Sequence, residues 1–328
     1  MIHFLYLDLD LYMYYFDLRH NVKKLKTQHK NLRRNKFRHS SELGYHYITR
    51  TLHFSTHKQD VEELEYTASA NMPTWTADSP EVFWNAADQY ESINGRTSTH
   101  ITVALPKELN YMQRIDLSNQ LIYEFCGQYQ MPYSFAIHNH VSSLDGRYEQ
   151  PHLHLLYSER SIYDGIERTP ELFFQRNCPK NPERGGAKKL TADVLGLGRH
   201  QINHYRKITE NVINKYLEKY APVKEVEIYG VKFQVENKVS CLSNKDYNKK
   251  YGTNLKDVPQ IPRHYLHSED HEIQEKLNIF RQTVKEIREA NLYELYQAEY
   301  QLELSRRNQY QYENNDIAQK PKSNDFDF

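Results

Sequence analysis

The sequence is poor in the features that mark several common classes of protein. It has 3 cysteines among 328 residues and no Cys-x-x-Cys pair, so neither a disulfide framework nor a cysteine-bound zinc site is indicated. It contains no glycine-rich phosphate-binding loop and no internal repeat. Its apolar N-terminal stretch is interrupted by Asp8, Asp10 and Asp17 and has no basic region before it, which argues against a signal or membrane segment. We therefore expect a cytoplasmic protein that does not insert into membranes.

The chain also lacks an excess of either charge, with 43 basic and 43 acidic residues. Zero net charge weighs against a nucleic-acid partner, because phosphate binding normally requires an excess of lysine and arginine. The distribution is uneven, however, since basic residues dominate the segment 19–50. This segment indicates a phosphate-binding surface, and a solvated basic helix is the alternative interpretation. Its basic residues include Lys23, Lys24, Lys26, Arg33, Arg34 and Arg50.

Hydrophobic periodicity predicts a mixture of helices and strands. The helices are expected over residues 40–52, 80–94, 107–129 and 200–220, and again beyond residue 262. The strands are expected over residues 4–11, 101–105, 133–138, 152–157 and 223–235. The polar sequence between 133–138 and 152–157 favours an antiparallel hairpin. These elements predict an α+β fold with a mainly antiparallel central sheet.

The remaining segments suggest how the chain is organised. Residues 1–268 are expected to form the main domain, which includes the basic segment 19–50, and within it the stretch between 52 and 80 is acidic and polar. Residues 164–189 are rich in Gly, Pro, Asn and charge, which predicts an extended mobile loop. An apolar stripe at helical spacing predicts a helical extension over 269–307, and the polar tail 308–328 is expected to be disordered.

Three histidines carry the strongest chemical signal. In a strand, residues two apart point the same way with about 7 Å between side chains, so His152 and His154 share a face while Leu153 enters the core. If the hairpin forms, His138 lies on the neighbouring strand, where cross-strand side chains come within about 5 Å. Three neutral imidazoles can bind a divalent metal ion and leave positions open for substrate oxygens, as in metal-assisted attack at phosphorus.

The same histidines have plainer interpretations. A lone histidine in a strand more often has no special function, and a structural zinc site would need a fourth ligand, for which no cysteine is close in sequence. His140 falls in the predicted loop and is left out of the site. Imidazole binds zinc, nickel and iron, so the residues alone do not name the metal.

A series of short motifs follows a fixed order along the chain. They are Tyr47-Ile48-x-Arg50, Phe83-Trp84-Asn85-Ala86-Ala87-Asp88-x-Tyr90-Glu91, Asn94-Gly95-Arg96, Ala104-Leu105-Pro106-x-Glu108-Leu109, Met131-Pro132-Tyr133, Ala136-Ile137-His138, Pro151-His152-x-His154-Leu155, Ser158-Glu159-Arg160, Asp164-Gly165-Ile166-Glu167-Arg168 and Pro182-Glu183-x-Gly185-Gly186-Ala187-x-Lys189. In these motifs the chain resembles the MobA/MobL relaxases of mobilizable plasmids, MOBQ-type members of the HUH endonuclease superfamily, over about residues 41–220.

The resemblance implies an enzyme that nicks one DNA strand at a plasmid transfer origin. A tyrosine forms a covalent 5′-phosphotyrosine, which is religated after transfer. The metal ligands implied are His138, His152 and His154, with Mn²⁺ or Mg²⁺ as the ion and Zn²⁺ as the alternative. Motif alignment places the nucleophile at Tyr47, and Tyr45 is the alternative, because residues two apart on a helix face different ways. A tyrosine hydroxyl with a pKa near 10 is a weak nucleophile, so a metal that polarises the phosphate suits this chemistry.

Further roles follow from the motif positions. Arg50, one turn after Tyr47, is expected to contact a phosphate, with a surface ion pair as the alternative. Related proteins often carry acidic residues in the strand before Ala104, where this chain has His100 and Thr102. Glu63, in the acidic stretch, is the candidate for a carboxylate that orients a ligand imidazole.

The expected partner is single-stranded transfer-origin DNA, lying along the face that bears the histidines. The loop 164–189 would close over it, with Arg184, Lys188, Lys189 and the basic segment contacting phosphates. Plasmid accessory proteins and the coupling protein of a type IV secretion system are the further partners that the resemblance implies. The alternatives are a replication or transposition initiator of the same superfamily, and a non-enzymatic DNA-binding accessory protein whose histidines hold structural zinc.

Overall fold

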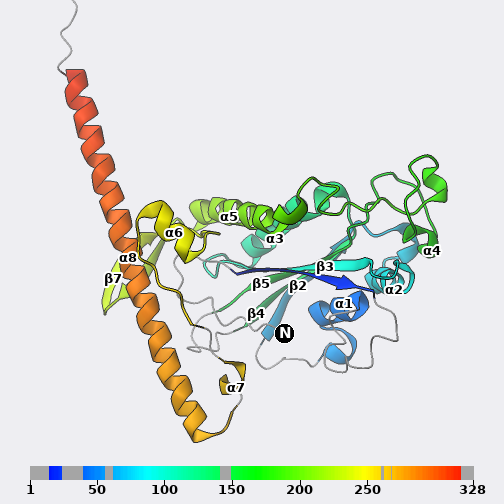
Figure 1. Cartoon of the computed structure of the whole chain (residues 1–328), viewed down its shortest axis with the longest axis horizontal. Coiled ribbons are helices and arrows are strands. Elements are labelled where there is room, and N and C mark those ends of the chain that lie inside the picture. The colour runs from blue at the N-terminus through cyan, green and yellow to red at the C-terminus, as the bar shows by residue number, and fades with distance from the viewer. Residues whose placement is uncertain are drawn as a thin grey trace, which may run out of the picture. The chain divides into compact units, whose positions relative to one another are not determined.

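The computed structural model describes residues 15–23, 40–55, 62–140, 149–259, 262–266 and 268–318 (Figure 1). The chain divides into two compact units. Among the described residues, the first lies within 15–222 and 236–241, and the second within 223–235 and 242–318. Within the described residues, no helix is both long and apolar enough to cross a membrane. The strand predicted over 4–11 lies outside the described residues.

A five-stranded sheet forms the centre of the first unit. Its strands are β1 (Phe16–Val22), β2 (Glu62–Ala70), β3 (Arg96–Ala104), β4 (Tyr133–His140) and β5 (His152–Tyr157). Their order is β1-β3-β5-β4-β2, and every pair of neighbours is antiparallel. The predicted α+β fold, with its antiparallel sheet and its hairpin of β4 and β5, is confirmed. The acidic, polar stretch conceals an edge strand, β2, which the sequence did not lead us to expect.

One face of this sheet packs against helices α3 (Tyr111–Phe125) and α5 (Gln201–Tyr220). Alternation along the central strands brings Leu153, Leu155 and Ile137 to this face, where each is fully buried. Helix α3 begins with a capping box, since Asn110 and Gln113 exchange side-chain and backbone hydrogen bonds. The larger hydrophobic core of the unit therefore lies on the side of the sheet away from the three histidines.

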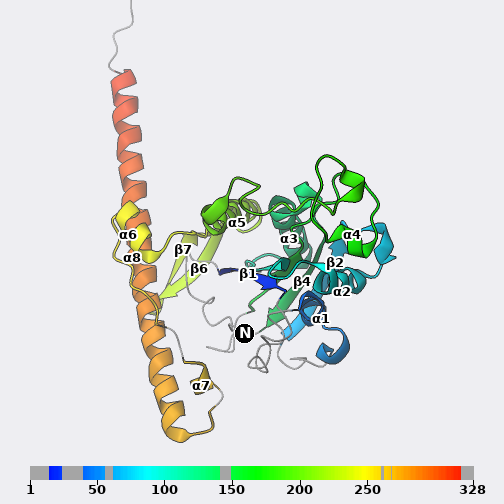
Figure 2. The ribbon, with the colours of Figure 1, turned by 45° about the vertical axis from the view of Figure 1, so that its right-hand side comes forward.

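The opposite face packs against α1 (Ser41–Thr49) and α2 (Pro80–Tyr90), as Figure 2 shows from a second direction. The Ser40 side chain caps α1 by accepting a hydrogen bond from the Leu43 amide. Asp88 of α2 accepts two more, from the amides of Ser41 at 2.8 Å and Glu42 at 3.1 Å. A carboxylate at a helix N-terminus is stabilising, and here it also links α1 to α2.

The segment 164–189 is packed, so the prediction of an extended loop is wrong. It contains the short helix α4 (Pro170–Phe173), which lies beside α2, and it buries Phe173, Phe174 and Ala187 against α1 and α2. Arg160, itself buried, donates hydrogen bonds to the carbonyls of Phe174, Gln175 and Ala187. These bonds attach the segment to the end of the sheet.

The second unit contains a hairpin and three helices. The predicted strand 223–235 is two strands, β6 (Val223–Ile228) and β7 (Val231–Glu236), joined by a turn in which Tyr229 and Gly230 have positive φ angles of 50° and 79°. Helices α6 (Asn244–Tyr251), α7 (Arg263–Leu266) and α8 (His271–Ala318) follow. Helix α8 continues beyond residue 307, where the helical extension was expected to end. Residues 242–268 group with α8, and the functional boundary at 268 stays a prediction.

Candidate metal centre

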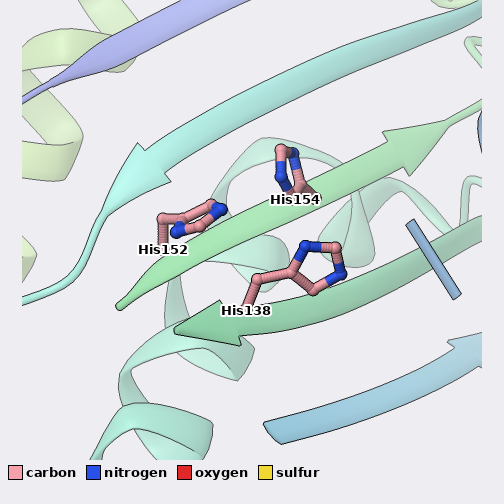
Figure 3. A group of neighbouring side chains, drawn as sticks. All are labelled: His138, His152 and His154. Atoms are coloured by element: carbon pink, nitrogen blue, oxygen red, sulfur yellow. The ribbon is translucent and has the colours of Figure 1, made fainter. Parts of the chain in front are cut away.

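The three predicted histidines converge on the face of the sheet that α1 covers (Figure 3). His152 and His154 project from β5 and His138 from β4, directly opposite His152 in the register. The ring centroid of His154 lies 4.9 Å from that of His138 and 4.9 Å from that of His152. One nitrogen from each ring can be chosen so that all three lie within 4.8 Å of one another. All three side chains are buried, so the donors of a metal site are preassembled.

Hydrogen bonds to backbone carbonyls fix the orientation of two of these rings. His138 Nε2 lies 2.6 Å from the Ile48 carbonyl oxygen, and His152 Nδ1 lies 2.9 Å from that of Gln150. A carbonyl oxygen only accepts, so each of these nitrogens carries the proton and donates it. The other nitrogens, His138 Nδ1 and His152 Nε2, are unprotonated and carry the lone pairs that would bind a cation. Metal-binding histidines typically have this arrangement.

His154 is held by two side chains from β3. Its Nδ1 lies 3.1 Å from His100 Nε2 and 3.2 Å from Thr102 Oγ1, so His154 Nε2 is the nitrogen that would bind a cation. Burial lowers the pKa values of His138 and His154, and burial together with the nearby Arg19 charge lowers that of His100 to about 4. The imidazoles of His100, His138 and His154 are thus kept in the neutral form, which is the form that binds metals. His100 and Thr102 occupy the two positions at which acidic residues were expected from the family resemblance.

A carboxylate completes the cluster, but it belongs to Glu62 and not to the predicted Glu63. Glu62 Oε1 lies 3.4 Å from His152 Nε2 and 3.8 Å from His138 Nδ1, whereas Glu63 is exposed. Adjacent strand residues face opposite ways, which explains the error of one position. Burial raises the pKa of the Glu62 carboxyl, but the polar groups around it hold that pKa well below its usual range. The ion pair with the Arg50 guanidinium keeps Glu62 ionised.

His140 is also part of this neighbourhood, although it was left out as a loop residue. It is the last residue of β4, and its ring centroid lies 5.3 Å from that of His152. With Glu62 and His152 it forms a second group whose ligand atoms lie within 4.8 Å of one another. The converging neutral nitrogens and the adjacent negative charge fit a divalent metal ion, which would be held by His138, His152 and His154.

Arg50 links the cluster to helix α1. It follows the last residue of that helix in a left-handed conformation with φ of 54°. Its Nη1 donates to the Tyr47 carbonyl at 3.0 Å, and its Nη2 donates to His138 Nδ1 at 3.3 Å and to the Glu62 carboxylate. Its guanidinium carbon lies 4.7 Å from the centre of the Tyr47 ring. The alternative expectation of a surface ion pair is wrong, since only 9% of the Arg50 side chain is exposed.

The two candidate tyrosines differ in their surroundings. The ring centroid of Tyr47 lies 6.2 Å from that of His154 and 5.7 Å from that of Phe54. Tyr45 instead packs against His46, at 5.4 Å between centroids, and burial and the Glu81 carboxylate raise its pKa. Of the two, Tyr47 is the one next to a candidate metal ligand.

The predicted DNA-binding residues are spread widely. Lys24, Lys26, Arg33 and Arg34 lie outside the described residues. Lys23 Nζ donates to the Gln89 carbonyl at 2.6 Å, while Arg184 and Lys188 are exposed. Lys189 is engaged inside the protein, because its Nζ donates to the Arg96 carbonyl at 2.8 Å and lies 3.3 Å from Glu91. It is therefore a poor candidate for a phosphate contact.

Comparison with known proteins identifies the family of the chain. Residues 33–238 match the model of the MobA/MobL family. The chain belongs to the MobA/MobL family. A similar curated protein, the 43 kDa relaxation protein of Salmonella typhimurium, is 36% identical over 194 residues, which are 57% of this chain and 50% of that protein. Mobilization protein A of Escherichia coli is 39% identical over 134 residues, which are 41% of this chain and 18% of that protein.

The chain spans at most half the length of these two relatives. Among solved structures, one described as "Molecular Basis of Vancomycin Resistance Transfer in Staphylococcus aureus" is similar with a TM-score of 0.42 and 18% identity. The match covers 70% of this chain and 99% of that chain. The family assignment rests on the family model and not on this structural likeness.

Proposed function

We propose that this MobA/MobL chain is a metal-dependent DNA relaxase that nicks one strand at a plasmid transfer origin, with Tyr47 as its nucleophile. The observation that carries the proposal is the position of Tyr47, whose ring lies 6.2 Å from His154 in a buried three-histidine cluster. The printed names of the two relatives, a relaxation protein and a mobilization protein, point to the same function.

The reaction is a transesterification at phosphorus. The Tyr47 Oη forms a bond to the scissile phosphorus, the bond from phosphorus to the 3′ oxygen breaks, and the tyrosine proton passes in net terms to that oxygen. A divalent ion held by the three histidines would polarise the phosphate and stabilise developing negative charge. The product is a 5′-phosphotyrosine and a free 3′ hydroxyl. One phosphodiester replaces another, so the strand can be rejoined without ATP.

The residues behind the ligands would serve this chemistry by keeping the site rigid. His100, Thr102 and the carbonyls of Ile48 and Gln150 hold the three rings in orientation, and Asp88 anchors the helix that carries Tyr47. We propose Mn²⁺ or Mg²⁺ as the ion, with Zn²⁺ as the alternative, and exposed Arg184 and Lys188 as contacts to DNA phosphates. The setting would be the cytoplasm, with separate accessory and coupling proteins completing transfer.

Covalent capture from a randomised DNA library tests the function and identifies the cleaved sequence in the same step. The protein is incubated with the single-stranded library and Mn²⁺, denatured in detergent, and recovered with any DNA still attached, which is then sequenced. We expect one family of sequences joined through a 5′ phosphate, and no adduct when a chelator is present. Failure to form an adduct with folded protein, shown by calorimetry to hold Mn²⁺, would contradict the proposal and favour a DNA-binding accessory protein.

The two tyrosines provide the matched variants. Tyr47→Phe removes only the hydroxyl and should abolish the adduct, while Tyr45→Phe, one half-turn away on the same helix, should retain it. An adduct that persists in Tyr47→Phe and disappears in Tyr45→Phe would assign the nucleophile to Tyr45.

A further inference from the structure

The guanidinium of Arg50 contacts two of the side chains that face the candidate metal position, His138 at Nδ1 and Glu62 at Oε2. Its Nη2 donates to His138 Nδ1 at 3.3 Å and to the Glu62 carboxylate. The Arg50 and Glu62 side chains are only 9% and 3% exposed. A buried carboxylate requires a positive partner, because an unpaired buried charge is strongly destabilising. Arg50 supplies that charge from the end of α1.

His138 Nδ1 has one lone pair in the plane of its ring, and its other nitrogen is already committed to the Ile48 carbonyl. An N–H donor and a metal ion cannot use that lone pair together. At Glu62 the guanidinium pairs with Oε2 while Oε1 faces the histidines, so a divalent cation among the histidines would lie close to the guanidinium and repel it. The two cations are therefore alternatives at His138 Nδ1.

We propose that in the metal-free protein the Arg50 guanidinium occupies the metal position, and that metal binding displaces it from His138 Nδ1 and Glu62. Either cation compensates the buried Glu62 charge, so the cluster stays balanced in both states. The displaced guanidinium remains tethered beside Tyr47, whose ring centre is 4.7 Å from it. This last step rests on the proposed function, under which that position adjoins the scissile phosphate and the released arginine contacts the DNA.

The metal affinity of the protein without DNA tests the displacement. Titration calorimetry with Mn²⁺ compares the wild type with Arg50→Gln, which removes the competing charge. Arg50→Gln should bind Mn²⁺ at least about fivefold more tightly, because close charge repulsion in a buried site is strong. Arg50→Lys keeps a positive charge on a flexible side chain, so its Mn²⁺ affinity should lie between those of the wild type and Arg50→Gln. Equal or weaker binding by folded Arg50→Gln would overturn the proposal.

Arg114→Gln is the matched control. Arg114 pairs with Glu65 on the same strand as Glu62, at 2.6 Å, and the two side chains are 7% and 9% exposed. Its loss removes an equally buried ion pair without touching the histidines, so it should leave the Mn²⁺ affinity unchanged. In thermal unfolding without metal, both variants should have a lower melting temperature than the wild type. Added Mn²⁺ should raise the melting temperature of Arg50→Gln, and of no other variant, by more than it raises that of the wild type. An equal gain in both variants would mean that Arg50 is only a structural anchor.

A separate measurement tests whether the displaced Arg50 guanidinium contacts DNA. With Tyr47→Phe in the background to prevent cleavage, the salt dependence of binding to single-stranded oligothymidine is measured with and without Mn²⁺. One phosphate contact on single-stranded DNA changes the slope of log affinity against log salt by about 0.7. Arg50→Gln should reduce the slope by about this amount only in the Mn²⁺-loaded protein. A reduction of the same size without metal would contradict the displacement. Neither measurement depends on a covalent adduct, so this proposal and the relaxase function can fail independently.

Discussion

Two buried polar clusters in the first unit differ in how their hydrogen-bonding groups are matched. In the cluster around Arg160, all five N–H donors of the guanidinium find acceptors, two on Glu91 and three on backbone carbonyls. In the histidine cluster, acceptors converge instead, since His138 Nδ1, His152 Nε2 and the Glu62 carboxylate face one another. A cluster with matched donors and acceptors is a structural clamp. A buried cluster with converging acceptors requires a cation.

The strongest test of this contrast removes one ligand. His152→Ala should eliminate Mn²⁺ binding in calorimetry and in metal analysis of the purified protein. Only the imidazoles of His138 and His154 would remain, and two imidazoles do not enclose the ion. His20→Gln, which alters a partly buried histidine of the same sheet that hydrogen-bonds Thr99, should bind Mn²⁺ normally. Full metal content in His152→Ala would mean that the ion is bound elsewhere.

Disrupting the Arg160 cluster should lower the stability of the fold without changing the affinity of the protein for the metal. Arg160→Met leaves the Glu91 carboxylate, 2% exposed at its side chain, without its main partner, and should lower the free energy of unfolding by about 3–5 kcal/mol. Urea denaturation measures this effect, with Lys276→Gln in an exposed ion pair on α8 as a control expected to cause no measurable change. The folded Arg160→Met protein should retain the wild-type Mn²⁺ affinity, and a large loss of affinity would show that the two clusters are coupled.

A smaller effect on metal binding is expected from the two side chains that orient His154. The double variant His100→Ala, Thr102→Val removes both side chains that hold His154 Nδ1 and should weaken Mn²⁺ binding about 10- to 100-fold. Thr99→Val is the control on the same strand, since its hydroxyl contacts His20 and not His154. An unchanged affinity in the double variant would show that packing alone orients His154.

The smallest expected effect concerns pH. Burial, aided by the Arg96 and Lys189 charges, lowers the pKa of His20 from 6.5 to about 4. Between these values the unfolded chain binds the proton and the folded protein does not, so stability falls as the pH falls from 6.5 towards 4. In urea titrations at several pH values with saturating Mn²⁺, His20→Gln should show a shallower fall than the wild type. Identical curves would exclude a contribution from His20.

The sequence predicted a large part of the fold because periodicity survives in well-buried elements. Helices α1, α2 and α5 and the hairpin of β4 and β5 were all expected from apolar spacing, and the strand period alone brought His152 and His154 to one face. Other elements were hidden. Strand β2 is acidic and lies at the sheet edge, so its pattern resembles a solvated loop. The packed segment 164–189 is held by Arg160 and by aromatic contacts from distant parts of the chain, which no local pattern reveals.

The sequence by itself determined the three candidate metal ligands, because strand alternation and the pairing of two adjacent strands are local properties. The carboxylate was decided only by the tertiary structure. Strand β2 changes register between Leu64 and Tyr66, so Leu64 packs on the side of α1 and α2 while Tyr66 and Ala68 pack on the other side. Simple alternation would place all even-numbered residues on one face. The bulge separates them and brings Glu62 to the histidines, because an extra residue in one strand reverses the direction of the side chains beyond it.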